Sequence, residues 1–375
     1  MTLVNSPMQS DAPKRILIGW GDETSGNLGV RVLGQGSRDL LRQLWPDAEY
    51  VYLNYGSKPA EIPWGWRGLL RERASGSLGM MKWLGEFDLF WDTRSGDSFA
   101  DIYGLDRHLT MFLIHEFAVQ AGVPAVVAPQ TIGPFHGRFA AALAKRNLKR
   151  SALVFARDSA SAEAADQLGR AVDLTVTDMV FGLNQPAASP EPGDVLLNVS
   201  GLLWEPNTHV DSVKYQQSVR IILDGLIAQD REVTLLPHVI PHETDSPGKD
   251  GDVYVARTLA AEYSGRVRVH VPSSLDDVRT VIASSTVLIG ARMHACLNAL
   301  STGVPAVAMA YSRKFAPLMR ALEWDHVVDL AADRHPGASV LQALSTPELA
   351  QQARLTQRAG QDRLAEVLPL IAGLR

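Results

Sequence analysis

One five-residue phrase occurs twice in the sequence, in two similar surroundings. Gly122-Val-Pro-Ala-Val126 recurs as Gly303-Val-Pro-Ala-Val307. In both places a stretch with helical spacing precedes the phrase, and an apolar stretch typical of a buried strand follows. Alternating strands and helices form parallel sheets covered by helices on both faces, so the repeat predicts two similar α/β units. The copies are too far apart for a solenoid, whose repeats run to roughly 50 residues.

A proline-rich stretch divides the chain between these two units. Residues 184–193 hold three prolines and no large apolar side chain, which is typical of a linker. We therefore expect two Rossmann-like domains, residues 14–183 and 194–345, facing each other across a cleft. Residues 1–13 are polar and are expected to be a disordered arm. Residues 346–375 are expected to form one or two amphipathic helices that could pack on either domain.

The composition excludes several classes of protein. Of 375 residues, 46% are apolar and 21% are charged, which is ordinary for a soluble globular protein. The net charge of −5 gives no reason to expect nucleic acid as a partner. No apolar run reaches the roughly 18 residues of a transmembrane segment, and the polar start lacks a signal-peptide core, so a cytoplasmic location is expected. The single cysteine, Cys296, rules out disulfides within the chain and is expected to be buried.

The strongest candidate site lies where a buried strand ending at Gly290 gives way to a helix beginning near Met293. Ligands of open α/β sheets bind at that edge, and a helix N-terminus favours an anion. Arg292 offers a planar fork that fits a carboxylate or phosphate, or it pairs with a nearby acid and holds the fold. His294 can transfer a proton near neutral pH, or it is structural.

Two further segments contain candidate groups. Arg157 follows an apolar strand and either binds a ligand or pairs with Asp158, which would cap the next helix. The loop after residue 237 holds His238 and His242, with Asp252 further on. The spacing fits no common zinc pattern, and the prolines of the loop prevent a helix from aligning the two imidazoles. We therefore expect no metal site.

A set of phrases, in their order along the chain, resembles the polysaccharide pyruvyl transferases, which are similar in architecture to two-domain GT-B glycosyltransferases. The phrases are Gly26-Asn-Leu-Gly29, Gly96-Asp-Ser-Phe-Ala-Asp-Ile-Tyr-Gly104, Ala128-Pro-Gln-Thr-Ile-Gly-Pro-Phe135, Phe155-Ala-Arg-Asp158, Leu197-Asn-Val-Ser-Gly201, Leu236-Pro-His238 and the segment from Arg292 to Lys314. The family often has a Gly-Gly pair where this chain has Arg94-Ser95. The resemblance implies a GT-B-like fold of two Rossmann-like domains.

The resemblance also implies a reaction. The enolpyruvyl carbons of phosphoenolpyruvate would move onto two hydroxyls of a sugar in a cell-surface polysaccharide or its precursor, forming a pyruvate ketal and releasing phosphate. The partners would be phosphoenolpyruvate and a sugar or glycan acceptor, free or lipid-linked, with no cofactor and no metal. Arg292 and His294 would be catalytic, with His294 moving the proton or supporting the leaving phosphate. The implied substrate-binding residues are Arg157, Asn27, Asp97, Gln130, His238 and Lys314.

Two other functions remain open. The first is a GT-B glycosyltransferase that uses a nucleotide sugar, because its fold would look the same. The second is a carbohydrate-binding member of the fold without catalytic activity. Three tryptophans, Trp64, Trp66 and Trp83, flank Arg-rich segments and either stack on sugar rings or pack within the protein.

Overall fold

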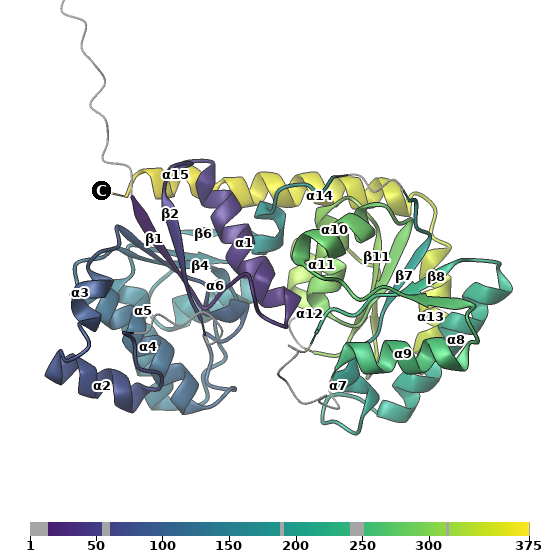
Figure 1. The fold of residues 1–375 in the computed structure, drawn as a ribbon, viewed down its shortest axis with the longest axis horizontal. Coiled ribbons are helices and arrows are strands. Elements are labelled where there is room, and N and C mark those ends of the chain that lie inside the picture. Colours follow the sequence, from purple (N-terminus) through teal and green to yellow (C-terminus); the bar gives the residue numbers. More distant parts are fainter. Residues whose placement is uncertain (1–13, 55–60, 188–190, 241–250, 313–314, 375) are drawn as a thin grey trace, which may run out of the picture.

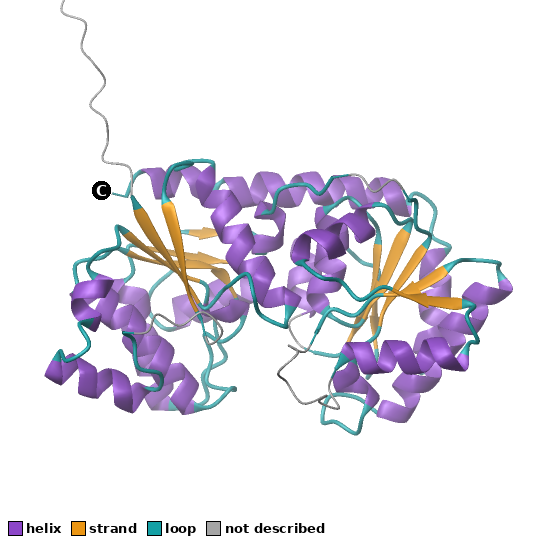
Figure 2. Ribbon diagram, viewed as in Figure 1, coloured by secondary structure: helices purple, strands orange, loops and turns teal. Residues whose placement is uncertain are grey.

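The computed structural model describes residues 14–54, 61–187, 191–240, 251–312 and 315–374. Within these ranges the chain forms two six-stranded sheets whose strands are all parallel to their neighbours. Figure 2 shows helices on both faces of each sheet. The predicted fold class, two α/β units with parallel sheets, is therefore confirmed. The expected arm at residues 1–13 lies outside the described residues.

The first half of the chain forms a sheet with the spatial order β2-β1-β3-β4-β5-β6. Its strands are β1 (Arg15–Gly19), β2 (Glu49–Leu53), β3 (Leu89–Asp92), β4 (Ala125–Gln130), β5 (Leu153–Ala156) and β6 (Leu174–Thr175). Its helices are α1 (Leu28–Arg42), α2 (Trp66–Ser75), α3 (Met80–Leu84), α4 (Leu105–Gln120), α5 (Arg138–Arg150) and α6 (Ser159–Gln167), with 3₁₀ turns η1 (Arg94–Gly96) and η2 (Met179–Gly182).

The second half forms a sheet with the order β12-β11-β10-β7-β8-β9. Its strands are β7 (Val195–Asn198), β8 (Val233–Leu235), β9 (Val267–Val269), β10 (Val287–Gly290), β11 (Ala306–Ala310) and β12 (Val327–Asp329). Its helices are α7 (Gly201–Trp204), α8 (Ser212–Ala228), α9 (Asp252–Glu262), α10 (Leu275–Ala283), α11 (Met293–Ser301), α12 (Phe315–Ala321) and α13 (Pro336–Leu344). None of the helices in the described ranges is long and apolar enough to cross a membrane.

The repeated Gly-Val-Pro phrase closes a helix and opens a strand in both halves. Gly122 and Gly303 adopt left-handed φ angles of 87° and 78°, a conformation that glycine reaches without a steric penalty. The valine that follows each glycine donates its N–H to the third-last residue of the helix, Ala118 or Ala299. These bonds form Schellman caps. The proline then cannot continue the helix, and β4 or β11 begins soon after it.

The two halves share one hydrophobic core. A single cluster of buried side chains includes Ile16 and Val32 of the first half together with Leu288 and Leu300 of the second. Helix α1 packs against α11 of the other half. The backbone also pairs across the halves, since Leu28 donates to the carbonyl of His238 at 3.3 Å and Ile240 to that of Gly26 at 2.8 Å. We call this line of contact the seam.

The last helices, α14 (Leu349–Ala365) and α15 (Val367–Ala372), cross from the second half back to the first (Figure 1). Helix α14 contacts both α11 and η2. Gly360 lies so close to Phe181 that a Cβ atom there would be 2.5 Å from its ring. The C-terminal segment therefore holds the two halves together at the seam, rather than packing on one of them.

Candidate functional site

The polar residues at the ends of the strands gather along the seam. In the first half Gln130 ends β4, Arg157 follows β5 and Asp178 follows β6 by three residues. In the second half Arg292 follows β10 by two residues and Tyr311 follows β11. Because parallel strands all end at one edge of their sheet, these side chains collect where ligands of open α/β sheets bind.

Arg157 is a buried cation held by two side chains of its own half. Its Nη1 lies 2.7 Å from Asp178 Oδ2, and its Nε donates to Thr131 Oγ1 at 2.9 Å. The residue is 1% exposed, and its Nη2 has no hydrogen-bond partner among the described residues. Asp158 instead caps α6 by accepting from the Ser161 N–H at 2.7 Å. The alternative of an Arg157–Asp158 pair is thus resolved, because the acid paired with Arg157 is Asp178.

His294 reaches across the seam from α11 to the same acid. Its Nε2 lies 3.7 Å from Asp178 Oδ1, close enough for an ion pair when the imidazole is protonated. The other face of the ring lies against the start of α1, where a Cβ atom on Gly29 would be 2.7 Å from Nδ1. The His294 side chain is 17% exposed. It is therefore fixed between two segments of the first half while one part of it meets solvent.

Asp178 is ionised in this arrangement. Its complete burial alone would raise the pKa of the carboxyl group, but the charges of His294 and Arg157 and the Val180 N–H hold that pKa well below its usual range. The sequence motifs do not single out Asp178. The signal that points to it is its position three residues after β6, at the same strand-end edge where Arg157 was expected.

Arg292 is held by a second buried acid. Its Nη2 lies 2.7 Å from Asp252 Oδ1, and 16% of its side chain is exposed. Asp252, with no exposed surface, also accepts from the N–H groups of Gly201, His238 and Val239. Burial would lower the pKa of Arg292, but the Asp252 carboxylate raises it above its ordinary value. The Nε and Nη2 groups of Arg292 donate to the Asp252 carboxylate. The third nitrogen of the guanidinium, Nη1, makes no hydrogen bond to any residue in the described ranges.

His238 lies inside the second half. It is 1% exposed, and its Nε2 faces the Asn298 amide at 3.2 Å. Burial and the nearby His294 and Arg292 lower its pKa to about 3. The imidazole is therefore neutral near pH 7, and it contacts protein atoms. Its role in binding the acceptor stays a prediction.

The remaining predicted substrate-binding residues occupy separate positions. Asn27 caps α1 by accepting from the Gly29 N–H at 2.9 Å, next to His294. Gln130 is fully buried and donates to the Asp92 carbonyl at 2.8 Å. Asp97 accepts a 2.6 Å hydrogen bond from the Tyr103 hydroxyl and faces the cleft between the halves. Lys314 lies outside the described residues.

In the loop after β3, two residues that are not glycine adopt the left-handed backbone conformation that glycine favours. Arg94 and Ser95, which stand where the family often has a Gly-Gly pair, have φ angles of 45° and 52°. Such conformations cost about 1–2 kcal/mol per residue. Arg94 offsets this cost with hydrogen bonds to Asp92 at 2.9 Å and Asn147 at 2.5 Å and by lying 4.2 Å from the Phe99 ring. The departure from the family pattern is thus accommodated by a buried ion pair.

A pocket of about 580 Å³ opens between the two halves. Asp97, Tyr103 and Thr131 line it from the first half, and His209 and Tyr311 line it from the second. It adjoins Arg157, because the Thr131 hydroxyl that lines it accepts a hydrogen bond from Arg157 Nε. We call it the cleft pocket.

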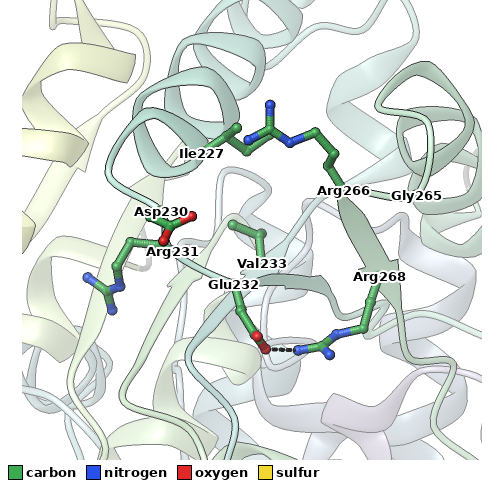
Figure 3. Close-up of a pocket in the computed structure, with 8 residues that line it drawn as sticks. All are labelled: Ile227, Asp230, Arg231, Glu232, Val233, Gly265, Arg266 and Arg268. Carbon is green, nitrogen blue, oxygen red and sulfur yellow. Dashed lines mark hydrogen bonds and ion pairs between the residues drawn. The ribbon is translucent and has the colours of Figure 1, made fainter.

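Another hollow, of about 270 Å³, lies at the opposite edge of the second sheet, where β8 and β9 begin. Figure 3 shows that Glu232 and Arg268 pair with each other inside it. Arg231 pairs with Asp194. Because most of its charged groups already have partners and it lies away from the strand ends, we do not place the active site there.

The other candidate groups are built into the fold. Cys296 is buried, and burial raises the pKa of its thiol to about 12. The rings of Trp64 and Trp83 make edge contacts with Trp20 and Phe87. No group of three or more His, Cys, Asp or Glu in the described ranges is arranged to hold a metal ion.

Comparison with known proteins identifies a family and a fold. Residues 27–313 match the model of the family described as polysaccharide pyruvyl transferase. No curated protein matches the sequence.

Several solved structures are similar along nearly the whole chain. A putative UDP-N-acetylglucosamine 2-epimerase from Listeria monocytogenes has a TM-score of 0.63 at 11% identity, with 96% of both chains covered. HepE from Anabaena, solved with UDP and glucose, has a TM-score of 0.52 at 15% identity, with 97% of this chain and 100% of that chain covered. MnaA from S. aureus, solved with UDP, has a TM-score of 0.58 at 13% identity, with 95% of both covered. These similarities show a GT-B-like fold.

Proposed function

The chain belongs to the polysaccharide pyruvyl transferase family, and we propose that it moves the enolpyruvyl group of phosphoenolpyruvate onto two hydroxyls of a sugar. The product would be a pyruvate ketal on a cell-surface polysaccharide or its precursor, free or lipid-linked. The observation that carries the proposal is the meeting of Arg157, Asp178 and His294 at the seam. This arrangement combines a fixed cation with a group that can transfer a proton.

The two arginines are suited to a donor that carries both a carboxylate and a phosphate. Arg157 and Arg292 are each oriented by a buried carboxylate, and each has a terminal nitrogen that hydrogen-bonds to no described residue, Nη2 and Nη1 respectively. The Arg157 Nη2 group is buried, and a buried donor without a partner costs about 1–3 kcal/mol, so an anion that supplies the missing acceptor there gains that energy. Arg292, with 16% of its side chain exposed, presents its Nη1 group where a ligand can reach it. We assign Arg157 and Arg292 to the binding of phosphoenolpyruvate.

The reaction requires transfer of two hydroxyl protons. A proton is added to the methylene carbon of phosphoenolpyruvate, and the resulting oxocarbenium-like C2 is attacked by the first sugar hydroxyl, which loses its proton. The C2–O bond to phosphate then breaks, and the second hydroxyl attacks C2 and loses its proton in turn. Overall, one hydroxyl proton ends on the new methyl group and the other leaves with phosphate. We assign His294 to this proton transfer because imidazole titrates near neutral pH.

Asp178 acts on the reaction through His294. Its ionised carboxylate lies on the Nε2 side of the ring, 3.7 Å away, where it faces the nitrogen that would carry or release the proton. A buried carboxylate that orients a catalytic histidine is a known arrangement in proton transfer. Asp178 is therefore a positioning residue, and no cofactor is needed for the proposed steps. We further propose that Asn27, Asp97, Gln130, His238 and Lys314 contribute to substrate binding.

The decisive experiment is phosphate release from phosphoenolpyruvate with a panel of acceptor glycans. We expect release that depends on the acceptor, together with a product carrying the added mass of a pyruvate ketal. Thermal shift with phosphoenolpyruvate and with a panel of nucleotide sugars separates this function from glycosyl transfer. Turnover of a nucleotide sugar without use of phosphoenolpyruvate would establish the glycosyltransferase alternative, and sugar binding without any turnover would establish a binding protein.

A further inference from the structure

The cleft pocket lies beside Arg157 and at the same strand-end edge of the second sheet as Arg292, but its described wall is aromatic and hydroxylated rather than cationic. Thr131, which lines it, accepts from Arg157 at 2.9 Å. Tyr311, which lines the opposite side, directly follows β11, and this strand pairs with β10, the strand that precedes Arg292. A ligand in the pocket would therefore lie next to a donor bound by the two arginines.

Aromatic rings and hydroxyl groups form the wall of the pocket. The Tyr311 ring packs edge-on against His209 at 5.5 Å and Phe315 at 5.7 Å between centroids. Tyr103 is 45% exposed, and its hydroxyl is fixed by Asp97. Aromatic rings have flat apolar faces, which match the C–H face of a pyranose. A carboxylate and the Thr131 hydroxyl accept hydrogen bonds, which sugar hydroxyls donate.

The part of the pocket wall that the structure describes carries no cationic side chain. None of its described lining residues is Lys or Arg, and Asp97 contributes a carboxylate. The described wall therefore suits a neutral sugar better than a phosphate or diphosphate. The volume of about 580 Å³ is within the range of about 300–1,000 Å³ typical of small-ligand sites.

We propose that the cleft pocket is the acceptor site and binds an uncharged pyranose residue, with Tyr311 and Tyr103 against the ring and Asp97 and Thr131 bound to its hydroxyls. The identification of this sugar as the acceptor rests on the proposed function. The binding of a neutral pyranose at this place does not, so the two can be tested separately.

Saturation-transfer difference NMR tests the site without donor or turnover. The probes are the methyl glycosides of galactose, glucose and mannose, with disaccharides of each and with UDP for comparison. We expect at least one pyranoside to be saturated most strongly on the protons of one ring face. Tyr311→Ala should weaken that binding by about fivefold or more, given that aromatic contacts contribute about 1 kcal/mol. Tyr311→Phe should keep most of it, because the ring remains.

Two controls separate binding from folding. Tyr103→Ala, at an exposed position on the other half, should weaken pyranoside binding while the melting temperature stays close to that of the wild type. Tyr254→Ala removes an equally large aromatic side chain, 59% exposed on α9, and should change nothing. Thermal shift with phosphoenolpyruvate should remain normal in Tyr103→Ala, since Asp178 and Asp252, which hold Arg157 and Arg292, are unchanged by this substitution.

Several results would overturn the inference. Absence of saturation for every pyranoside, or unchanged binding in both Tyr311→Ala and Tyr103→Ala, would remove the sugar from the pocket. Saturation of UDP that is lost in Tyr311→Ala would assign the pocket to a nucleotide. If pyranosides bind as expected but phosphoenolpyruvate is never turned over, the sugar site stands and the proposed reaction fails.

Discussion

His294 Nε2 lies 3.7 Å from Asp178 Oδ1, and the two residues come from different halves of the chain. The acid is buried and already bound to Arg157, so the histidine meets a carboxylate whose charge and position are fixed. Proton transfer at the seam therefore depends on how the halves are joined. Two features hold the halves together: the hydrogen bond from the Leu28 N–H to the His238 carbonyl, and helix α14, which contacts α11 of the second half and η2 of the first.

Removal of the Asp178 charge should destabilise the protein. In Asp178→Asn, the Arg157 guanidinium remains buried without a counter-charge, and breaking one side of a buried ion pair costs about 3–5 kcal/mol. We expect urea unfolding at pH 7 to show a loss of about this size. Since the folded-state pKa of Asp178 is lowered, its stabilising effect is present above the ordinary aspartate pKa of about 3.9 and is lost as the pH falls further. The gap between wild type and variant should therefore shrink on acidification below about pH 4. A gap independent of pH would contradict an ionised Asp178.

Arg292 should control affinity for the donor. A charge-assisted hydrogen bond contributes about 1.5–3 kcal/mol, so Arg292→Ala should weaken phosphoenolpyruvate binding by about 10- to 150-fold in calorimetry. Arg292→Lys should recover part of this loss, because a point charge cannot reproduce the planar fork. Arg231→Ala is the matched control: this arginine also pairs with an acid, Asp194, but lies at the opposite edge of the sheet. Equal affinities for a folded Arg292→Ala variant and the wild type would remove Arg292 from the donor site.

His294 should affect turnover more than binding. His294→Gln preserves a polar side chain of similar size but cannot exchange a proton near neutral pH. We expect kcat to fall by about 100-fold or more with nearly unchanged donor affinity. The readouts are phosphate release and calorimetry. A stability loss that fully accounts for the lower rate would support the structural alternative for this histidine.

Short sequence patterns, such as helix caps and apolar runs, were sufficient to predict the two α/β units. Gly122 and Gly303 predicted the same helix end in both halves because a left-handed cap followed by proline depends on a few neighbouring residues. The buried strands could be predicted in the same way, since parallel strands covered on both faces are continuously apolar. The predicted strand ends therefore placed Arg157 and Arg292 after β5 and β10, at the carboxyl edges of the two sheets, as the structure has them.

The acids that pair with Arg157 and Arg292 could not be predicted from short sequence patterns. Asp252 is 40 residues from Arg292 in sequence, and Asp178 meets His294 only because α1, η2 and α11 pack together. No local pattern specifies which acid approaches which base. Asp252 did appear in the sequence analysis, but as a weak metal candidate. The cleft pocket was missed because Tyr311 and Tyr103 come from loops of different halves.

His238 should contribute to the acid sensitivity of the fold. Burial lowers its pKa to about 3, whereas in the unfolded chain it titrates near 6.5. As the pH falls below about 6.5, the unfolded chain binds a proton at His238 before the folded protein does. The stability that the folded protein gains from the neutral imidazole is therefore complete above about pH 6.5 and is lost between pH 6.5 and pH 3. The slope is up to about 1.4 kcal/mol per pH unit. His238→Gln keeps a hydrogen-bond acceptor for Asn298 and does not titrate, so its unfolding free energy should depend less steeply on pH between 6 and 4. Identical slopes in urea titrations would mean that His238 is protonated in the folded protein.

Gly29 should determine where the His294 ring can lie. A Cβ atom at this position would be 2.7 Å from His294 Nδ1, closer than side chains approach one another, and 3.1 Å from Asn27 Oδ1, which is a tight contact. Alanine is otherwise favourable within a helix, by about 1 kcal/mol over glycine, so Gly29→Ala should fold with near-normal stability. The imidazole must then shift relative to Asp178, and we expect kcat to fall by about tenfold or more while phosphoenolpyruvate still binds.

A double-mutant cycle identifies the cause of that loss. If Gly29→Ala acts only by displacing His294, then adding it to His294→Gln should lower kcat by much less than it does in the wild-type background. Fully additive losses would show instead that Gly29 affects the reaction by another route, for example through the Asn27 cap of α1. A Gly29→Ala enzyme with wild-type turnover would mean that the ring has room to move without consequence, and it would weaken the case that the position of His294 at the seam matters for proton transfer.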